Sequence, residues 1–259
     1  MTAAGPLASA APSDARDVRA LVLSVAFVWL ATALLIAHPF FRQVGEAHLD
    51  RLGLPHALMG ATCAFELALG LRVALGRPTT ALALLQAALV LGFTLILAVQ
   101  DPMLLAHPYG VLTKNLPLLG ALLSATLGAR EGFSPRVVWL LRVSMALPWL
   151  TEGLIPKLLF QQELELAVVR ASGLVPMDAA AFLRILGAAQ VASAVAALLL
   201  RGAPLRALLV LQAASLVVLP LLVSIHDPLL WVHPFLPLLK NVPILVGTVV
   251  LARRCSTWS

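Results

Sequence analysis

The sequence is poor in charged residues. Only 12% of its 259 residues are Asp, Glu, Lys or Arg, whereas a soluble globular domain carries about 25%. Hydrophobic residues make up 61% of the chain, and they gather in runs of roughly 17 to 25 residues, the length that crosses the hydrocarbon core of a bilayer. The shortage of charge therefore excludes an ordinary soluble domain and predicts an all-α integral membrane protein.

Residues and motifs typical of several enzyme classes are also scarce. The two cysteines, Cys63 and Cys255, are far apart and form no CxxC, which argues against a dithiol relay. Gly-rich phosphate loops, GxSxG and HExxH are absent. The net charge of +6 is spread between apolar segments, as in loops that set membrane topology, so no nucleic-acid partner is expected. We predict no catalytic residues, and a protein that is not an enzyme on its own.

Eight apolar segments follow one another along the chain. Backbone groups in lipid must be bonded within their own segment, so we expect each segment to be a transmembrane helix. The predicted spans are residues 18–38, 57–76, 80–99, 112–129, 136–156, 179–199, 205–225 and 238–252.

The two halves of the sequence resemble each other. HPYGVLTKNLP, at 107–117, returns as HPFLPLLKNVP, at 233–243, and the flanking residues 84–119 align with 210–245 without a gap, at a constant offset of 126 (233 − 107). Each half holds four predicted spans, which indicates two parallel four-helix repeats. The predicted organisation is a disordered cytoplasmic tail over 1–17, a first repeat over 18–131 and a second over 132–259.

Basic residues predict the orientation. Ten Lys and Arg lie in the termini and the tight turns, against six in the loops of the other face. By the positive-inside rule both termini are cytoplasmic. We therefore expect a multi-pass protein of a bacterial inner membrane, with the repeated phrase facing outward.

The repeated phrase places a lysine beside the start of a helix. Such a cation opposes the helix dipole by about 0.3–1 kcal/mol, so it needs an acid or an external anion as partner. Two interpretations follow, a structural helix start with a snorkelling lysine, or a ligand site for a lipid headgroup, a quinone carbonyl or an anion. Asp101 and Asp227 are the expected acid partners, and the asparagines are expected to cap the helices. The candidate residues are Asp101, His107, Lys114, Asn115, Asp227, His233, Lys240 and Asn241.

Polar residues inside the predicted spans form a second group of candidates. Glu66 lies near the middle of the second span, and Gln190 could fill the same role in the other half. Glu152 precedes Lys157 across Pro156, which allows either an ion pair between them or a functional carboxylate. For Glu66 we expect a buried hydrogen-bonding role rather than a proton relay.

The histidines give little support for a metal or haem. His107 and His233 could meet across a pseudo-twofold axis, but no further His or Cys spacing completes a ligand set. We predict no metal and no cofactor, with quinone as the alternative.

Two stretches resemble a known family. LLAHPYGVLTKNLPLLGALL, at 104–123, is similar to the HPFGPLxKNLPLL segment of the DoxX-like membrane proteins, and WLTEGLIPKLLF, at 149–160, resembles the first-helix signature of that family. The family module is a four-helix membrane domain, so the chain looks like two modules in tandem. Neither half has both motifs whole, because the first lacks the Glu-Gly…Pro-Lys signature and the second has Leu236 and Pro237 where the family prefers Gly-Pro. The resemblance implies a site shared across the tandem, or one half that has kept a function.

The resemblance also implies an accessory role in membrane redox chemistry. Three hypotheses follow. The first is a non-catalytic membrane subunit or scaffold, in contact with the lipid bilayer and with an oxidoreductase partner. The second is a quinone- or lipid-binding redox component that uses the outward His-Pro…Lys-Asn sites. The third is a small-solute transporter, which the concentration of polar residues at the outer ends disfavours.

Overall fold

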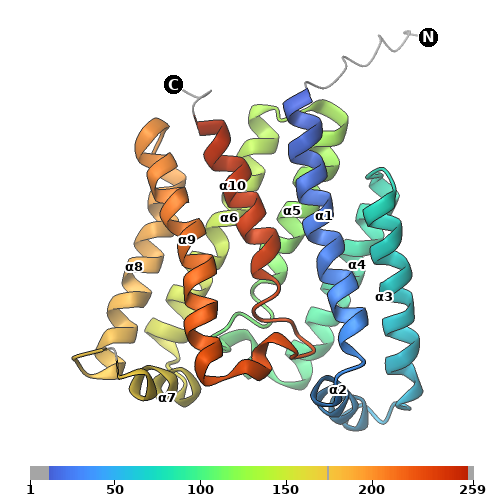
Figure 1. Ribbon diagram of the computed structural model, residues 1–259, viewed down its shortest axis with the longest axis vertical. Helices are drawn as coiled ribbons and strands as arrows, with labels where there is room; N and C mark the ends of the chain where they lie inside the picture. The colour runs from blue at the N-terminus through green and yellow to red at the C-terminus, as the bar shows by residue number, and fades with distance from the viewer. Residues whose placement is uncertain (1–11, 174, 256–259) are drawn as a thin grey trace.

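The computed structural model describes residues 12–173 and 175–255, which form helices and turns and contain no strand. Figure 1 shows the long helices standing side by side, with the start of α1 and the end of α10 at one end of the bundle. We call this the inner end, after the orientation that the basic residues predict. The short helices α2 and α7 lie at the opposite, outer end (Figure 1). The predicted all-α class is confirmed.

The helices of the first half are α1 (Pro12–Leu35), α2 (Pro39–Arg51), α3 (Ala57–Leu75), α4 (Thr80–Gln100), the short 3-10 helix η1 (Pro102–Ala106) and α5 (Asn115–Glu131). Those of the second half are α6 (Pro135–Gly153), the π-helical turn η2 (Leu154–Leu159), α7 (Glu163–Ser172), α8 (Ala179–Leu199), α9 (Gly202–His226), the 3-10 helix η3 (Pro228–Trp231) and α10 (Asn241–Arg254).

Six helices in the described part of the chain are long and apolar enough to cross a membrane: α1, α3, α4, α6 continued through η2, α8 and α9. The other two predicted spans are shorter than expected. α5 has 17 residues and α10 has 14, because the residues just before each helix form turns rather than further helix. The predicted starts at 112 and 238 are therefore wrong by three residues, and six rather than eight helices meet the length criterion.

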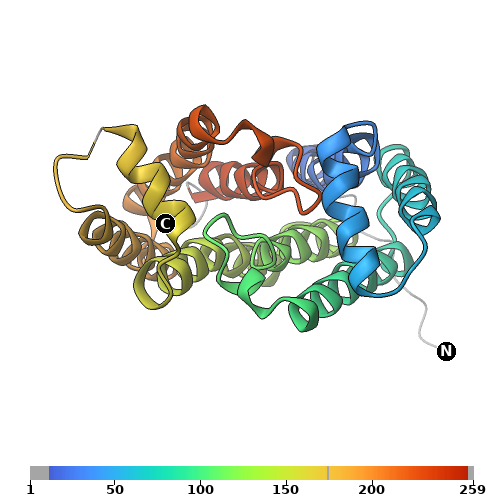
Figure 2. The same cartoon turned by 90° about the horizontal axis from the view of Figure 1, so that it is seen from below.

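Four helices form the centre of the bundle. α1, α5, α6 and α10 pack together, with α3 and α4 on one side and α8 and α9 on the other (Figure 2). Small residues allow close approach, as is typical of membrane helices. A Cβ atom added to Gly120 of α5 would lie 1.9 Å from Ser144 Oγ of α6. The centre of the core consists of fully buried apolar side chains, including Leu21, Val25, Leu141, Met145 and Ile244.

Apolar side chains also cover the outside of the bundle. Val99 of α4 is 82% exposed and Ile225 of α9 is 73% exposed. Water would not favour such a surface, whereas lipid does. The membrane-embedded helices therefore contact the bilayer.

Polar side chains begin the helices at the membrane boundaries. Thr79, Ser134 and Asp178 each accept a hydrogen bond from a backbone N–H in the first turn of α4, α6 and α8, which satisfies amides that have no partner within the helix. The outer helices α2 and α7 were not predicted, because both are short and carry charged residues on one side. Figure 2 shows them lying across the ends of the long helices.

The inner end ties the first helix to the last. Arg254 of α10 donates to Asp14 and Asp17 of α1, at 2.7 Å each, and both acids lie near the start of a helix, where the dipole favours them. The tail predicted over 1–17 is therefore too long, because α1 begins at Pro12. Residues 1–11 of that tail lie outside the described residues.

Candidate ligand-binding site

The two copies of the repeated phrase fold into the same turn. In the first copy the backbone N–H of Gly110 donates to the carbonyl of His107, and the backbone N–H of Lys114 donates to the carbonyl of Gly110. In the second copy the backbone N–H groups of Leu236 and Lys240 make the matching bonds, and all four distances are 2.9–3.1 Å. The turn needs a left-handed residue, with φ of 65° at Gly110 and 49° at Leu236. The missing glycine of the second copy therefore does not change the turn, and Leu236 carries the strain.

The histidines of the phrase hold this turn. The Nδ1 atoms of His107 and His233 accept hydrogen bonds from the backbone N–H of Tyr109 and Phe235, both at 3.3 Å. Burial, helped by neighbouring positive charge, lowers the pKa of both imidazoles to about 4. Neutral rings are what the two Nδ1 acceptors require, so both histidines have a structural role at neutral pH.

Each phrase reaches into the other half of the protein. Lys114 Nζ donates to the carbonyl of Pro237 at 2.8 Å, and Lys240 Nζ donates to the carbonyl of Val111 at 3.0 Å. Both lysines are buried. The two outer loops therefore interlock through a reciprocal pair of lysine–carbonyl bonds.

Lys114 also forms an ion pair across the halves. Its Nζ lies 3.4 Å from Glu152 Oε1, and the two side chains are 5% and 17% exposed. The expected partner Asp101 instead caps η1 by accepting from the backbone N–H of Met103. Neither Asp101 nor Asp227 forms an ion pair with a lysine in the described ranges. The prediction of those two pairs is therefore wrong, because each loop turns its lysine away from its own half.

Glu152 and Lys157 do not form the side-chain ion pair that was one of the two alternatives for them. Lys157 Nζ lies 3.0 Å from Glu165 Oε1 of α7 and donates to the backbone carbonyl of Glu152 at 3.3 Å. The π-helical turn around Pro156 places the lysine here, as such turns often do at functional sites. The outer end of the second half therefore holds two adjacent lysine–glutamate pairs.

The asparagines begin the helices without capping them. Lys114 and Lys240 occupy the cap positions of α5 and α10, with no side-chain cap hydrogen bond. Asn115 donates instead to Thr94 Oγ1 of α4 at 2.7 Å. Asn241 Oδ1 is buried with no hydrogen-bond partner in the described structure. The predicted capping role is therefore wrong, and the two copies differ.

Each half contains one cavity near its outer end. The first-half cavity, of about 310 Å³, is lined by α1 to α4 and by Pro234, Phe235, Leu236 and Lys240 of the other half. The second-half cavity, of about 600 Å³, is lined by α6 to α9 and by Pro108, Tyr109 and Lys114 of the other half. Both volumes suit a small organic ligand. The repeated phrase therefore completes the cavity of the opposite half.

The predicted polar residues of the spans line these cavities. Glu66 and Lys240 share the first-half cavity, and Glu152, Lys157 and Gln190 share the second. Glu66 Oε2 and Gln190 Oε1 are buried without a hydrogen-bond partner in the described structure. Their placement in matching cavities agrees with the expected correspondence between Glu66 and Gln190, although neither makes the hydrogen bond that we expected.

Polar groups are satisfied differently in the two cavities. In the first, Trp29 Nε1 donates to Gln86 Oε1 at 2.9 Å. In the second, the corresponding Gln212 turns to Ser193 Oγ at 2.7 Å, and Trp149 Nε1 is left buried with no hydrogen-bond partner in the described structure.

The asparagines show the same difference. Thr94, which accepts from Asn115, is replaced at the aligned position by Pro220 (94 + 126 = 220), and Pro220 has no hydroxyl to accept from Asn241. The second-half cavity therefore has more free hydrogen-bonding groups.

Five lining residues of the second-half cavity have a buried polar atom without a hydrogen-bond partner in the described structure. A buried group of this kind costs about 1–3 kcal/mol, so the cluster indicates a polar ligand. The atoms are Tyr109 Oη, Trp149 Nε1, Glu165 Oε2, Gln190 Oε1 and Asn241 Oδ1.

Three of these residues were not predicted as site residues. Trp149 was expected in an interfacial belt, but it is only 8% exposed and lines the cavity. Tyr109 is the single tyrosine of the chain and lies inside the repeated phrase, which could have marked it. Glu165 lies on α7, a helix that the sequence pattern did not reveal.

Metal ligands do not gather at this site. Within residues 12–173 and 175–255 no group of three or more His, Cys, Asp or Glu side chains could hold a metal ion. Cys63 and Cys255 are free and buried.

Comparison with known families agrees with the resemblance of each half to the DoxX-like module. The DoxX-like family matches twice, over residues 26–123 and 146–249, which is consistent with a tandem duplication of one module. Neither a curated protein nor a solved structure matches the chain. Because the two matched segments cover most of the sequence, the chain belongs to the DoxX-like family.

Proposed function

We propose that this protein binds a quinone or quinol in the second-half cavity and serves as the membrane component of a redox system. The observation that carries the proposal is the cluster of five unpartnered buried polar atoms in a mainly apolar cavity. Such a lining suits a lipophilic molecule with a few polar groups.

The polar atoms of the cavity determine which groups a ligand must carry to bind there. Trp149 Nε1–H and the Tyr109 hydroxyl can donate to a carbonyl oxygen. The oxygens of Glu152 and Glu165 can accept from a hydroxyl, and both lie beside lysines. A ring that carries either carbonyl or hydroxyl groups, as in the quinone and quinol pair, meets both requirements. The carboxylates would then accept hydrogen bonds from the hydroxyl groups of the quinol.

The cavity also reaches the surface that faces lipid. Its lining includes Leu219, Leu222 and Ile225 of α9, which are exposed apolar side chains. A lipophilic ligand could therefore enter from the bilayer without crossing water. A water-soluble substrate would have no such need, and this disfavours the small-solute transporter.

The proposal includes the topology that the sequence predicts. Eight membrane-crossing segments in two parallel four-helix repeats, with both termini cytoplasmic in a bacterial inner membrane, would place the second-half cavity near the outer surface. The basic residues of the inner end support this orientation. In this arrangement α5 and α10 would cross together with the turns that precede them.

The alternative is a non-catalytic scaffold for an oxidoreductase. The outer helix α2 favours a protein contact, because Arg42, Gln43, Glu46 and Asp50 line a shallow polar depression on it. The two hypotheses predict different effects of substituting the two lysines. A scaffold predicts that Lys114→Ala and Lys240→Ala act only through assembly or stability, whereas the binding hypothesis predicts loss of ligand from protein that remains in the membrane.

Tryptophan fluorescence tests the binding proposal. Decylubiquinone and menadione, added to the purified protein in detergent, are expected to quench emission along a saturable curve, because Trp149 lines the cavity. Trp149→Phe should remove the saturable component. Trp139→Phe is the matched control, since Trp139 lies at the inner end and is 48% exposed. Quenching that never saturates, or that is equal in all three proteins, would sink the proposal.

A further inference from the structure

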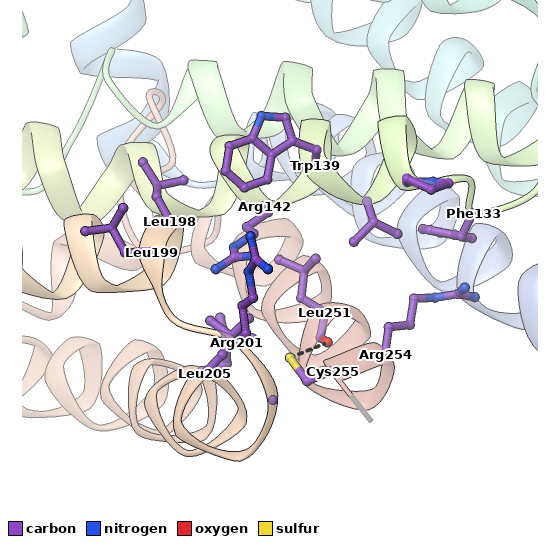
Figure 3. Close-up of a pocket in the computed structure, with 14 residues that line it drawn as sticks. Phe133, Trp139, Arg142, Leu198, Leu199, Arg201, Leu205, Leu251, Arg254 and Cys255 are labelled. Carbon is purple, nitrogen blue, oxygen red and sulfur yellow. Dashed lines mark hydrogen bonds between the residues drawn. The ribbon is translucent and has the colours of Figure 1, made fainter. Parts of the chain in front are cut away.

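A third cavity lies at the inner end, away from the candidate site. It has a volume of about 800 Å³ and is lined by residues of α6, α8, α9 and α10 and of the turn before α6 (Figure 3). Its apolar walls include Val138, Leu198, Leu205, Leu209 and Leu251. The proposed function does not use this cavity.

Positive charge gathers in this inner cavity. Figure 3 shows Arg142 of α6, Arg201 of the α8–α9 turn and Arg254 of α10 among the lining residues. Arg142 and Arg201 line the same cavity, so two like charges share it. The lining contains no acidic side chain. Arg254 is bound by Asp14 and Asp17 of α1.

Arg142 is held in an unusual place for a charged residue. It lies seven residues after Pro135 in α6, about 10 Å along the helix axis, within a segment apolar enough to span the membrane. Its guanidinium donates to the carbonyls of Ala197 and Leu200 at the end of α8, rather than pairing with an acid or reaching past the bundle. A charge at this depth is costly and indicates function.

The inner end of the first half, as far as the structure describes it, differs from this arrangement. The small cavity at the inner end of that half has a volume of about 10 Å³ and no charged lining residue. When the offset between the starts of the matched segments (146 − 26 = 120) is extended four residues upstream, Val22 occupies the position that corresponds to Arg142. The basic cavity is therefore a specific feature of the second half rather than a consequence of the fold.

We infer that this inner cavity binds an anionic phospholipid, with its phosphate between Arg142 and Arg201 and an acyl chain along the leucine-rich wall. Basic pockets between membrane helices on the cytoplasmic side are typical sites for anionic headgroups. Arginine suits the phosphate because its planar donors can bind two oxygens at once. The apolar wall distinguishes a phospholipid from free phosphate, which would gain nothing from it.

Native mass spectrometry of the delipidated full-length protein tests the inference. Phosphatidylglycerol, phosphatidylcholine or inorganic phosphate is added back, and the bound fraction is measured against concentration. We expect phosphatidylglycerol to bind more tightly than phosphatidylcholine, with no saturable binding of inorganic phosphate in the same range. Arg201→Gln should weaken phosphatidylglycerol binding about fivefold, and Arg142→Gln should weaken it at least as much if the variant folds.

Arg77→Gln is the matched control. Arg77 lies in the α3–α4 turn at the same end, is exposed and lines none of the cavities described above, so its loss should leave the affinity unchanged. The Arg201 side chain makes no capping hydrogen bond to α9 in the described structure, so Arg201→Gln remains informative where Arg142→Gln disturbs folding. Equal affinity for the two lipids, an equal effect of Arg77→Gln, or tight binding of inorganic phosphate alone would overturn the inference.

Discussion

Substitution of Lys114 by alanine is expected to destabilise the protein by about 3–5 kcal/mol, the cost of leaving one member of a buried ion pair without its partner. Glu152 would keep its charge in a cavity wall without its ion-pair partner, since the neighbouring Lys157 already pairs with Glu165, and the bond from Lys114 to the carbonyl of Pro237 would be lost as well. The measurement is thermal unfolding of the purified variant in detergent, followed by labelling of the buried thiols of Cys63 and Cys255.

A second variant distinguishes loss of the ion pair from a general loss of stability. Lys114→Met combined with Glu152→Gln removes both charges and keeps the side chains similar in size, so it should recover a large part of the lost stability. Arg170→Ala is the matched control, because its pair with Glu163 is 57% and 73% exposed, and such pairs contribute less than about 1 kcal/mol. If the double variant is no more stable than Lys114→Ala, the two residues are not coupled.

Gly110→Ala is expected to disrupt the candidate site more than any other glycine substitution in the outer loops. The residue has φ of +65°, and its Cβ would lie 2.6 Å from Glu152 Oε1 and 2.9 Å from Lys114 Cγ. The backbone strain costs about 1–2 kcal/mol, and the contact adds about 1–3 kcal/mol. We therefore expect a lower unfolding temperature together with loss of saturable quinone quenching.

Gly53→Ala is the comparison that isolates the contact. Gly53 has nearly the same φ, +64°, but nothing lies within 4 Å of its added Cβ. This variant should show only the backbone cost and should bind quinone as the unchanged protein does. Equal losses in both variants would show that the packing of Gly110 against Glu152 and Lys114 has no part in binding.

The long helices could be predicted because their apolar runs match the thickness of a bilayer. The starts of α5 and α10 could not, since residues 110–114 and 236–240 are as apolar as the helices that follow, and only the left-handed turns at Gly110 and Leu236 delay each helix. α2 and α7 were missed for a different reason. They lie across the bundle with one side exposed (Figure 2), so their patterns read as polar loops.

The candidate residues could be named from the sequence, but their partners could not. Lys114, Glu152 and Gln190 line one cavity, and their role in binding stays a prediction. The pairing of Lys114 with Glu152 was out of reach, because nothing in one sequence says that the loop of one half crosses to the other. The sequence also could not predict that the Trp149 indole has no partner in the described structure, because this depends on whether Gln212 binds Trp149 or Ser193.

The most direct test of the account is an analysis of the lipophilic molecules that stay bound when the protein is purified gently from its native membrane. The account predicts near-stoichiometric quinone in the unchanged protein. It also predicts the loss of that quinone in Lys114→Met with Glu152→Gln and its retention in Arg170→Ala. Bulk lipid without quinone in all three preparations, together with one dominant protein partner, would contradict the account and favour the scaffold.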